Sequence, residues 1–188
     1  MNVAERNISV MHIITGLNVG GAERQLPNLV IARRQAGASD RVVSLISDGV
    51  MVGELEEADV PVHNLGMQRG FPKPASLINL IFLIRRYKPD IIQSWMYHAD
   101  LFSTLALRIS GRWGRTKLVW GLRCSNMDLS DYGRSLRLTI KLCARYSHLP
   151  DLIVANSEVG LQAHQKLGYN PEQEKEYIQS VIKADFQE

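Results

Sequence analysis

Two polar residues that could act on a substrate follow apolar segments of the chain. His98 comes shortly after segment 90–95, and Arg123 directly follows segment 116–122. A histidine titrates near neutral pH and could serve as a general acid, a general base or a group that binds a hydroxyl. An arginine stays charged and cannot act as a base, so Arg123 would hold a phosphate or a hydroxyl electrostatically. The structural alternative for His98 is that it caps or packs against the next helix.

Glycines follow the first apolar segment, 10–15. Residues 16–26 read Gly-Leu-Asn-Val-Gly-Gly-Ala-Glu-Arg-Gln-Leu, and helical spacing begins after Gly21. A strand that passes through glycines into a helix brings bare amides to the edge of a sheet, where the helix N-terminus carries partial positive charge. This stretch could therefore meet an anion, with Arg24 as a further phosphate contact. Alternatively, the glycines only close the turn and Arg24 is solvated.

Aromatic, amide and hydroxyl side chains follow the same predicted strand ends. Trp95 and Tyr97 could stack on a sugar or lipid acceptor, or they could pack in the core. Ser125 and Asn126 could hydrogen-bond the acceptor, or they could be ordinary turn residues. Ser157 directly precedes a segment of helical periodicity, and it is suited to be the N-cap of that helix.

Apolar segments of strand length alternate along the chain with segments of helical periodicity. The predicted strands are 10–15, 42–46, 60–65, 90–95, 116–122 and 152–156, and the predicted helices are 22–36, 52–58, 75–87, 99–110, 136–146 and 159–167. This alternation predicts an α/β fold, a Rossmann-like, mostly parallel sheet with helices on both faces. Pro61 places its strand at an edge, because proline cannot donate to a ladder. Ligands of such sheets lie beyond the carboxyl ends of the strands, so the polar residues above are expected at one edge.

Composition favours one globular domain. The chain has 188 residues, of which 45% are hydrophobic, and a formal net charge of +3. Its two cysteines, Cys124 and Cys143, are too few and too far apart for a disulfide framework or a zinc site. The N-terminus lacks a signal-peptide pattern, and the apolar stretch 77–84 is too short to span a membrane. A cytoplasmic location is therefore expected, with neither a cofactor nor a metal.

Three segments together resemble the N-terminal domain of the family 4 (group 1) glycosyltransferases, which have the two-domain GT-B fold. They are Gly-Gly-Ala-Glu-Arg at 20–24, Pro-Asp-Ile-Ile-Gln-Ser at 89–94 and Asp-Leu-Ile-Val-Ala-Asn-Ser at 151–157. The resemblance implies that residues 1–170 form a single GT-B N-terminal, acceptor-side domain. Residues 171–188 have the pattern of a charged amphipathic helix, which is either a divergent end or a helix that packs back on the domain.

The resemblance also implies a reaction, the transfer of a sugar from a nucleotide-sugar donor to a saccharide or lipid-linked acceptor in polysaccharide biosynthesis, without a metal and with retention. Asn18, Gly20 and Gly21 would lie opposite the donor diphosphate. Arg123 stands where many relatives carry a histidine that faces the reacting sugar, which is a departure. Most donor contacts in the family come from a second domain, whose carboxylate motif this sequence lacks. The chain alone is therefore expected to have little or no activity.

A basic stripe follows from the spacing of Arg134, Arg137, Lys141 and Arg145, which share one face of a predicted helix. The stripe could contact an anionic lipid surface or a lipid-diphosphate acceptor, which would place the protein at the inner face of a membrane. It could equally be a solvated face. No nucleic-acid partner is predicted, because no reading motif accompanies the charge.

Two other functions compete with this interpretation. A Rossmann oxidoreductase needs Gly-x-Gly-x-x-Gly and an acid after the second strand, whereas Gly16, Gly20 and Gly21 miss that spacing and Asp48 alone is thin support. A non-catalytic domain that binds a membrane or a polymer would need only the basic stripe.

Overall fold

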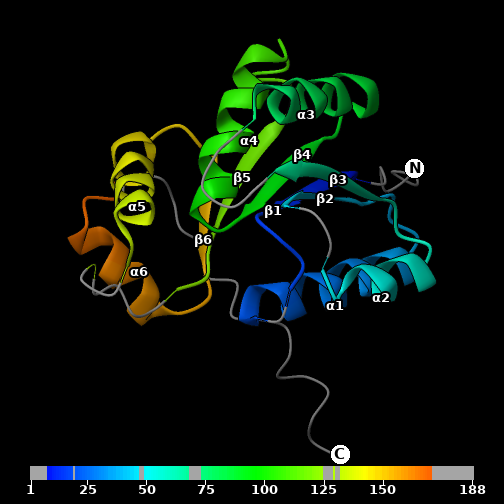
Figure 1. The fold of residues 1–188 in the computed structure, drawn as a ribbon, viewed down its shortest axis with the longest axis horizontal. Coiled ribbons are helices and arrows are strands. Elements are labelled where there is room, and N and C mark those ends of the chain that lie inside the picture. The colour runs from blue at the N-terminus through cyan, green and yellow to red at the C-terminus, as the bar shows by residue number, and fades with distance from the viewer. Residues whose placement is uncertain are drawn as a thin grey trace, which may run out of the picture.

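Six parallel strands form one sheet in the order β3-β2-β1-β4-β5-β6 (Figure 1). The computed structural model describes residues 8–18, 20–46, 49–67, 73–124, 129 and 132–170. The strands are β1 (Val10–Ile14), β2 (Arg41–Ile46), β3 (Val62–Met67), β4 (Ile91–Trp95), β5 (Lys117–Leu122) and β6 (Leu152–Ala155). The helices are α1 (Gly21–Gln35), α2 (Val52–Glu57), α3 (Pro74–Tyr87), α4 (Tyr97–Ile109), α5 (Arg134–Tyr146) and α6 (Glu158–Lys166). The predicted Rossmann-like fold is confirmed, while the helix predicted within 171–188 lies outside the described residues.

Helices cover both faces of the sheet because successive strand residues point to opposite sides. Met11 and Ile13 of β1 belong to a buried cluster with residues of α3, α4, α5 and α6, whereas Ile14 packs in a second cluster with residues of α1 and α2. Figure 1 shows α1 and α2 on one side of the sheet and α3 and α4 on the other. The apolar strands that the sequence shows are thus buried from both sides.

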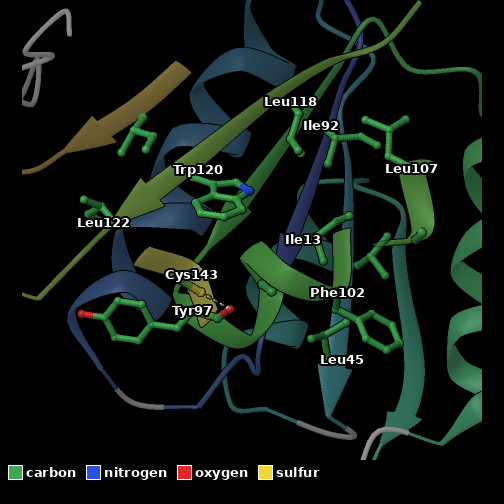
Figure 2. Packing of buried hydrophobic residues seen from close by; sticks show 14 of the residues in the cluster. Ile13, Leu45, Ile92, Tyr97, Phe102, Leu107, Leu118, Trp120, Leu122 and Cys143 are labelled. Carbon is green, nitrogen blue, oxygen red and sulfur yellow. Dashed lines mark hydrogen bonds between the residues drawn. The ribbon is translucent and has the colours of Figure 1, made fainter. Parts of the chain in front are cut away.

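The larger cluster joins α4 and α5 to β5 near the carboxyl edge of the sheet. Figure 2 shows Trp120 of β5 between the side chains of neighbouring strands and α4, with Cys143 of α5 beside Tyr97. The Cys143 thiol donates a hydrogen bond to the Tyr97 carbonyl oxygen over 3.3 Å, and the Trp120 indole N–H donates to the Thr104 hydroxyl over 3.1 Å. The first bond joins α5 to α4, and the second joins α4 to β5, one of the strands whose ends form the site.

β3 is the edge strand that the proline predicts. Pro61 lies just before the strand, and its carbonyl oxygen accepts a hydrogen bond from the Val42 N–H over 3.0 Å. The strand runs on to Met67, beyond its predicted end at residue 65. Gly66 takes a φ of 62° in this extension, a left-handed conformation that glycine adopts without strain.

The turn between β4 and α4 is sharper than the sequence indicates. Met96 has a φ of 75°, and its N–H donates to the Gly121 carbonyl oxygen over 3.3 Å. α4 therefore begins at Tyr97, two residues before the predicted helix at 99–110. The turn directs Tyr97 into the core and leaves His98 exposed.

Candidate active site

The helix that follows the glycine loop presents its N-terminus at the carboxyl edge of the sheet. Gly20 is the N-cap of α1, and no side chain caps the helix by a hydrogen bond. The Glu23 carboxylate folds back over Gly20, because a Cβ built on Gly20 would lie 2.3 Å from Glu23 Oε2. A Cβ built on Gly21 would have no atom within 4 Å, and Asn18 and Arg24 are exposed. The loop thus leaves open space above the first turn of α1.

The closest backbone approach to the glycine loop is made by a glycine from another segment of the chain. A Cβ built on Gly49, which precedes α2, would lie 2.2 Å from both the carbonyl carbon and the carbonyl oxygen of Leu17. The Met51 N–H donates to the same oxygen over 3.1 Å, and the Ile46 N–H donates to the Thr15 carbonyl oxygen over 2.9 Å. The role of Gly49 cannot be predicted from the sequence, because the contact joins segments that are far apart in the chain.

Arg123 lies across the end of β4, beside the first turn of α1. Its Cζ is 4.1 Å from the centroid of the Trp95 ring, and its Nη1–H donates to Gln25 Oε1 of α1 over 3.0 Å. Its Nε is buried without a hydrogen-bond partner among the described residues. Burial lowers the pKa of Arg123 to about 10, so the guanidinium is still charged at neutral pH. Gly121 of β5 approaches β4 closely beneath this side chain, because a Cβ there would lie 2.8 Å from the Ser94 carbonyl oxygen.

The aromatic residues predicted to stack on an acceptor are packed in the core instead. Trp95 is 1% exposed and Tyr97 is 4% exposed. Arg123 covers the Trp95 ring, and the Tyr97 hydroxyl donates to His164 Nε2 over 2.9 Å. The other ring nitrogen of His164, Nδ1, donates to the Gly160 carbonyl oxygen over 2.6 Å, which fixes this proton arrangement. Neither aromatic ring offers a free face to a ligand, so the packing alternative is the correct one for both.

His98 lies in the first turn of α4, where its side chain faces α5. Its Nε2 is 3.5 Å from the Thr139 hydroxyl oxygen of α5. The neighbouring helices partly desolvate the ring and lower the pKa of His98, so the imidazole is neutral at neutral pH. No contact between described residues joins His98 to Arg123. The two predicted catalytic residues therefore share an edge without touching.

Ser157 at the end of β6 is an N-cap, as its place in the sequence predicts. Its hydroxyl oxygen accepts a hydrogen bond from the Gly160 N–H over 3.1 Å. Ser125, Asn126 and Asp48 lie outside the described residues.

The basic stripe of α5 is exposed and is mixed with apolar side chains. Arg134, Arg137, Lys141 and Arg145 all reach solvent, as the helical spacing predicts. Three large apolar residues of the same helix are also exposed, namely Leu138 at 60%, Leu142 at 38% and Tyr146 at 44%. The helix packs through Ile140 and Cys143 on its opposite side. α5 thus presents a surface that is both basic and apolar.

The described part of the chain has neither a metal-binding cluster nor a membrane-spanning helix. No group of three or more histidine, cysteine, aspartate or glutamate side chains there could hold a metal ion. No described helix is long and apolar enough to cross a membrane.

The sheet, the glycine loop and the helical cover define the N-terminal half of a GT-B protein. The family model described as Glycosyltransferase Family 4 matches residues 19–174, and the chain therefore belongs to this family. No curated protein matches the chain.

Three solved structures with a similar fold illustrate the likeness. Anabaena Alr3699/HepE in complex with UDP and glucose is 18% identical, with a TM-score of 0.70 over 90% of this chain and 44% of that chain. The lipopolysaccharide outer core galactosyltransferase WaaB is 14% identical, with a TM-score of 0.63 over 90% of this chain and 44% of that one. MurG of Acinetobacter baumannii is 15% identical, with a TM-score of 0.58 and the same two coverages, 90% and 44%. The chain thus spans less than half the length of these proteins.

Proposed function

We propose that this chain is the acceptor-side domain of a glycosyltransferase that moves a sugar from a nucleotide-sugar donor to a saccharide or lipid-linked acceptor. The observation that carries the proposal is the position of Arg123 beside the first turn of α1, where the space around Gly21 is open. A charged guanidinium and a helix N-terminus both favour phosphate oxygens. Family membership supplies the reaction class.

In this proposal the donor diphosphate approaches Gly20, Gly21 and Asn18, and Arg123 stabilises the negative charge that develops on it as the sugar leaves. The remaining nitrogen of its guanidinium, Nη2, is the group that would reach a phosphate oxygen. His98 would contact an acceptor hydroxyl from the α4 side, since its neutral imidazole can accept a proton. The transfer proceeds with retention and without a metal, as in the enzymes that the sequence resembles.

The proposal also assigns most donor contacts to a second domain. The similar structures include Anabaena HepE bound to UDP-glucose, and the match covers 43% of that chain. A nucleotide sugar would lie between two such domains, with this chain forming the wall on the acceptor side. The 188 residues alone are therefore expected to turn over little or no donor.

Gly21→Ala tests whether a ligand approaches the glycine loop. The space around Gly21 predicts that the fold tolerates alanine, with a free energy of unfolding unchanged or raised by about 0.5 to 1 kcal/mol. With a donor-side domain supplied, the variant is expected to lose about tenfold or more in kcat/KM for the nucleotide sugar, because the methyl group occupies the approach to the amides. Unchanged kcat/KM in a folded variant would count against a diphosphate at this loop.

We further propose that α5 holds the domain on an anionic membrane surface on the cytoplasmic side. Its exposed leucines and tyrosine would enter the interface while the four basic residues contact lipid phosphates. A lipid-linked acceptor would then be presented at the edge of the sheet where α5 begins. The presence of exposed Leu138 and Leu142 in the same helix as the basic residues favours a lipid interface over a purely solvated face.

Sedimentation with vesicles tests the membrane proposal. Arg137→Glu with Lys141→Glu is expected to reduce binding to vesicles containing phosphatidylserine by about tenfold or more, since each basic residue contributes roughly 1 kcal/mol near such a surface. Arg86→Glu with Lys88→Glu makes the same change in net charge at the opposite edge of the sheet and should leave binding nearly intact. Equal losses in both variants, or no binding by the parent protein, would contradict a specific role for α5.

A further inference from the structure

A chain of polar side chains, most of them buried, runs beneath α1 from its last turn towards Arg123. Arg33 of α1 donates to Asp40 through Nε over 2.5 Å and through Nη2 over 3.1 Å. The Val10 N–H also donates to Asp40, over 3.1 Å, and the carboxylate is completely buried. Burial alone would raise the pKa of Asp40, but the hydrogen bonds from His12 and Arg33 outweigh it and lower that pKa, so the carboxylate is charged. Asp40 is thus a fixed negative group at the amino ends of β1 and β2.

His12 of β1 is the next member of this chain, and its proton positions follow from its two partners. The Trp95 indole N–H donates to His12 Nδ1 over 3.3 Å. An indole nitrogen can only donate, so Nδ1 carries no proton. The ring proton is therefore on Nε2, which lies 3.4 Å from Asp40 Oδ2. His12 is 1% exposed, and burial lowers its pKa, although Asp40 opposes the shift while the charges of Arg33 and Arg123 add to it.

Trp95 connects His12 to Arg123 at the carboxyl edge of the sheet. The N–H of its buried indole is held by His12, and its ring supports the Arg123 guanidinium at 4.1 Å. Gln25 is the one described side chain that hydrogen-bonds Arg123. If His12 offered no acceptor, a buried indole N–H would lose its partner, and the ring would be free to tilt towards another one. The surface beneath Arg123 would then move.

We propose that His12 is a positioning residue for Arg123: by accepting the Trp95 indole N–H and donating to Asp40, it fixes the aromatic surface on which the guanidinium lies. The consequence for sugar transfer rests on the proposed function. The positioning itself can be measured without any substrate, so the two ideas can fail separately.

Side-chain NMR of the 188-residue protein tests the proposal through the Arg123 Nε–H signal. This N–H is buried and is expected to exchange slowly with solvent. His12→Phe keeps a flat ring but removes the acceptor, and it should speed the exchange of Arg123 Nε–H by about tenfold or more. His12→Asn supplies a carbonyl oxygen near the position of Nδ1 that can accept the indole N–H, so it should restore exchange to within about threefold of the parent protein.

Thr104→Val is the matched control. It removes the acceptor of another buried indole, that of Trp120, on the opposite face of the sheet. It should lower the melting temperature much as His12→Phe does while leaving Arg123 Nε–H exchange unchanged. A similar acceleration in Thr104→Val would show that general loosening, and not positioning by His12, controls Arg123.

Trp95→Phe keeps the test decisive if His12→Phe fails to fold. It retains an aromatic ring under Arg123 but removes the N–H that His12 holds, so Arg123 Nε–H exchange should again accelerate. Slow, parent-like exchange in folded His12→Phe or in folded Trp95→Phe would overturn the proposal. So would fast exchange in His12→Asn, because the conservative variant would then have failed to rescue the pose.

Discussion

Replacing Gly49 with alanine is expected to lower the free energy of unfolding by about 3 kcal/mol, although this residue lies in a connection outside every helix and strand. The added Cβ would lie 2.2 Å from the carbonyl carbon and oxygen of Leu17 and 2.6 Å from its Cβ. These are mainly backbone atoms, so no side-chain rotation relieves the overlap. Either the loop after β1 or the start of α2 has to move, and the hydrogen bond from the Met51 N–H to Leu17 is strained or lost.

Urea denaturation measures the loss in free energy of unfolding. In a thermal melt, a domain of this size should show a melting temperature lower by roughly 6 to 12 °C. Gly53→Ala is the matched control, because a Cβ there has no atom within 4 Å and alanine favours the helix that contains it. That variant should be as stable as the parent protein or slightly more stable. If Gly49→Ala were equally harmless, the loop after β1 would not be closed by this contact, and the described geometry of the glycine loop would be wrong.

Most of the fold could be predicted from local patterns. Apolar runs of strand length alternate with helical spacing, and this alternation determines a parallel sheet whose carboxyl edge collects the strand ends. Pro61 marked the edge strand, and Ser157 marked a helix start. Each of these inferences depends on residues that are close together in the chain, which is why the sequence alone was sufficient.

The site was harder to predict because its decisive contacts are long-range. The Gly20-Gly21 pair suggested a backbone that needs glycine, yet the close approach is made by Gly49 against Leu17. Nothing adjacent in the sequence connects these segments. Gln25 was missed for the same reason, since an amide in the first turn of a helix is unremarkable until Arg123 is found beside it.

The aromatic residues show how one backbone angle can change an interpretation. Trp95 and Tyr97 follow a strand at the functional edge, where an exposed ring would stack well on a sugar. Met96 between them has a φ of 75°, a conformation that methionine rarely adopts and that its sequence context does not indicate. The resulting turn buries Tyr97, while Arg123 covers Trp95. The Arg123 guanidinium, and not the aromatic ring, therefore faces the space beyond the carboxyl ends of the strands.

Replacing Arg123 with alanine is expected to reduce sugar transfer by roughly a hundredfold, the usual loss when a preorganised charged donor is removed. The variant should keep most of its stability, because Arg123 is half-buried at the rim of the site. Arg123→Lys retains the charge but not the flat group that lies on Trp95 and bonds Gln25, so it should recover only part of the rate. Full activity in Arg123→Ala would remove Arg123 from the proposed mechanism.

The most direct measurement is sugar transfer from a panel of nucleotide sugars by the 188-residue chain, assayed alone and with a donor-side domain joined to it. We expect no appreciable turnover by the chain alone, turnover when the second domain is present, and a drop of roughly a hundredfold when the joined protein carries Arg123→Ala. Robust transfer by the isolated chain would contradict the claim that it forms only the acceptor-side wall of the active site.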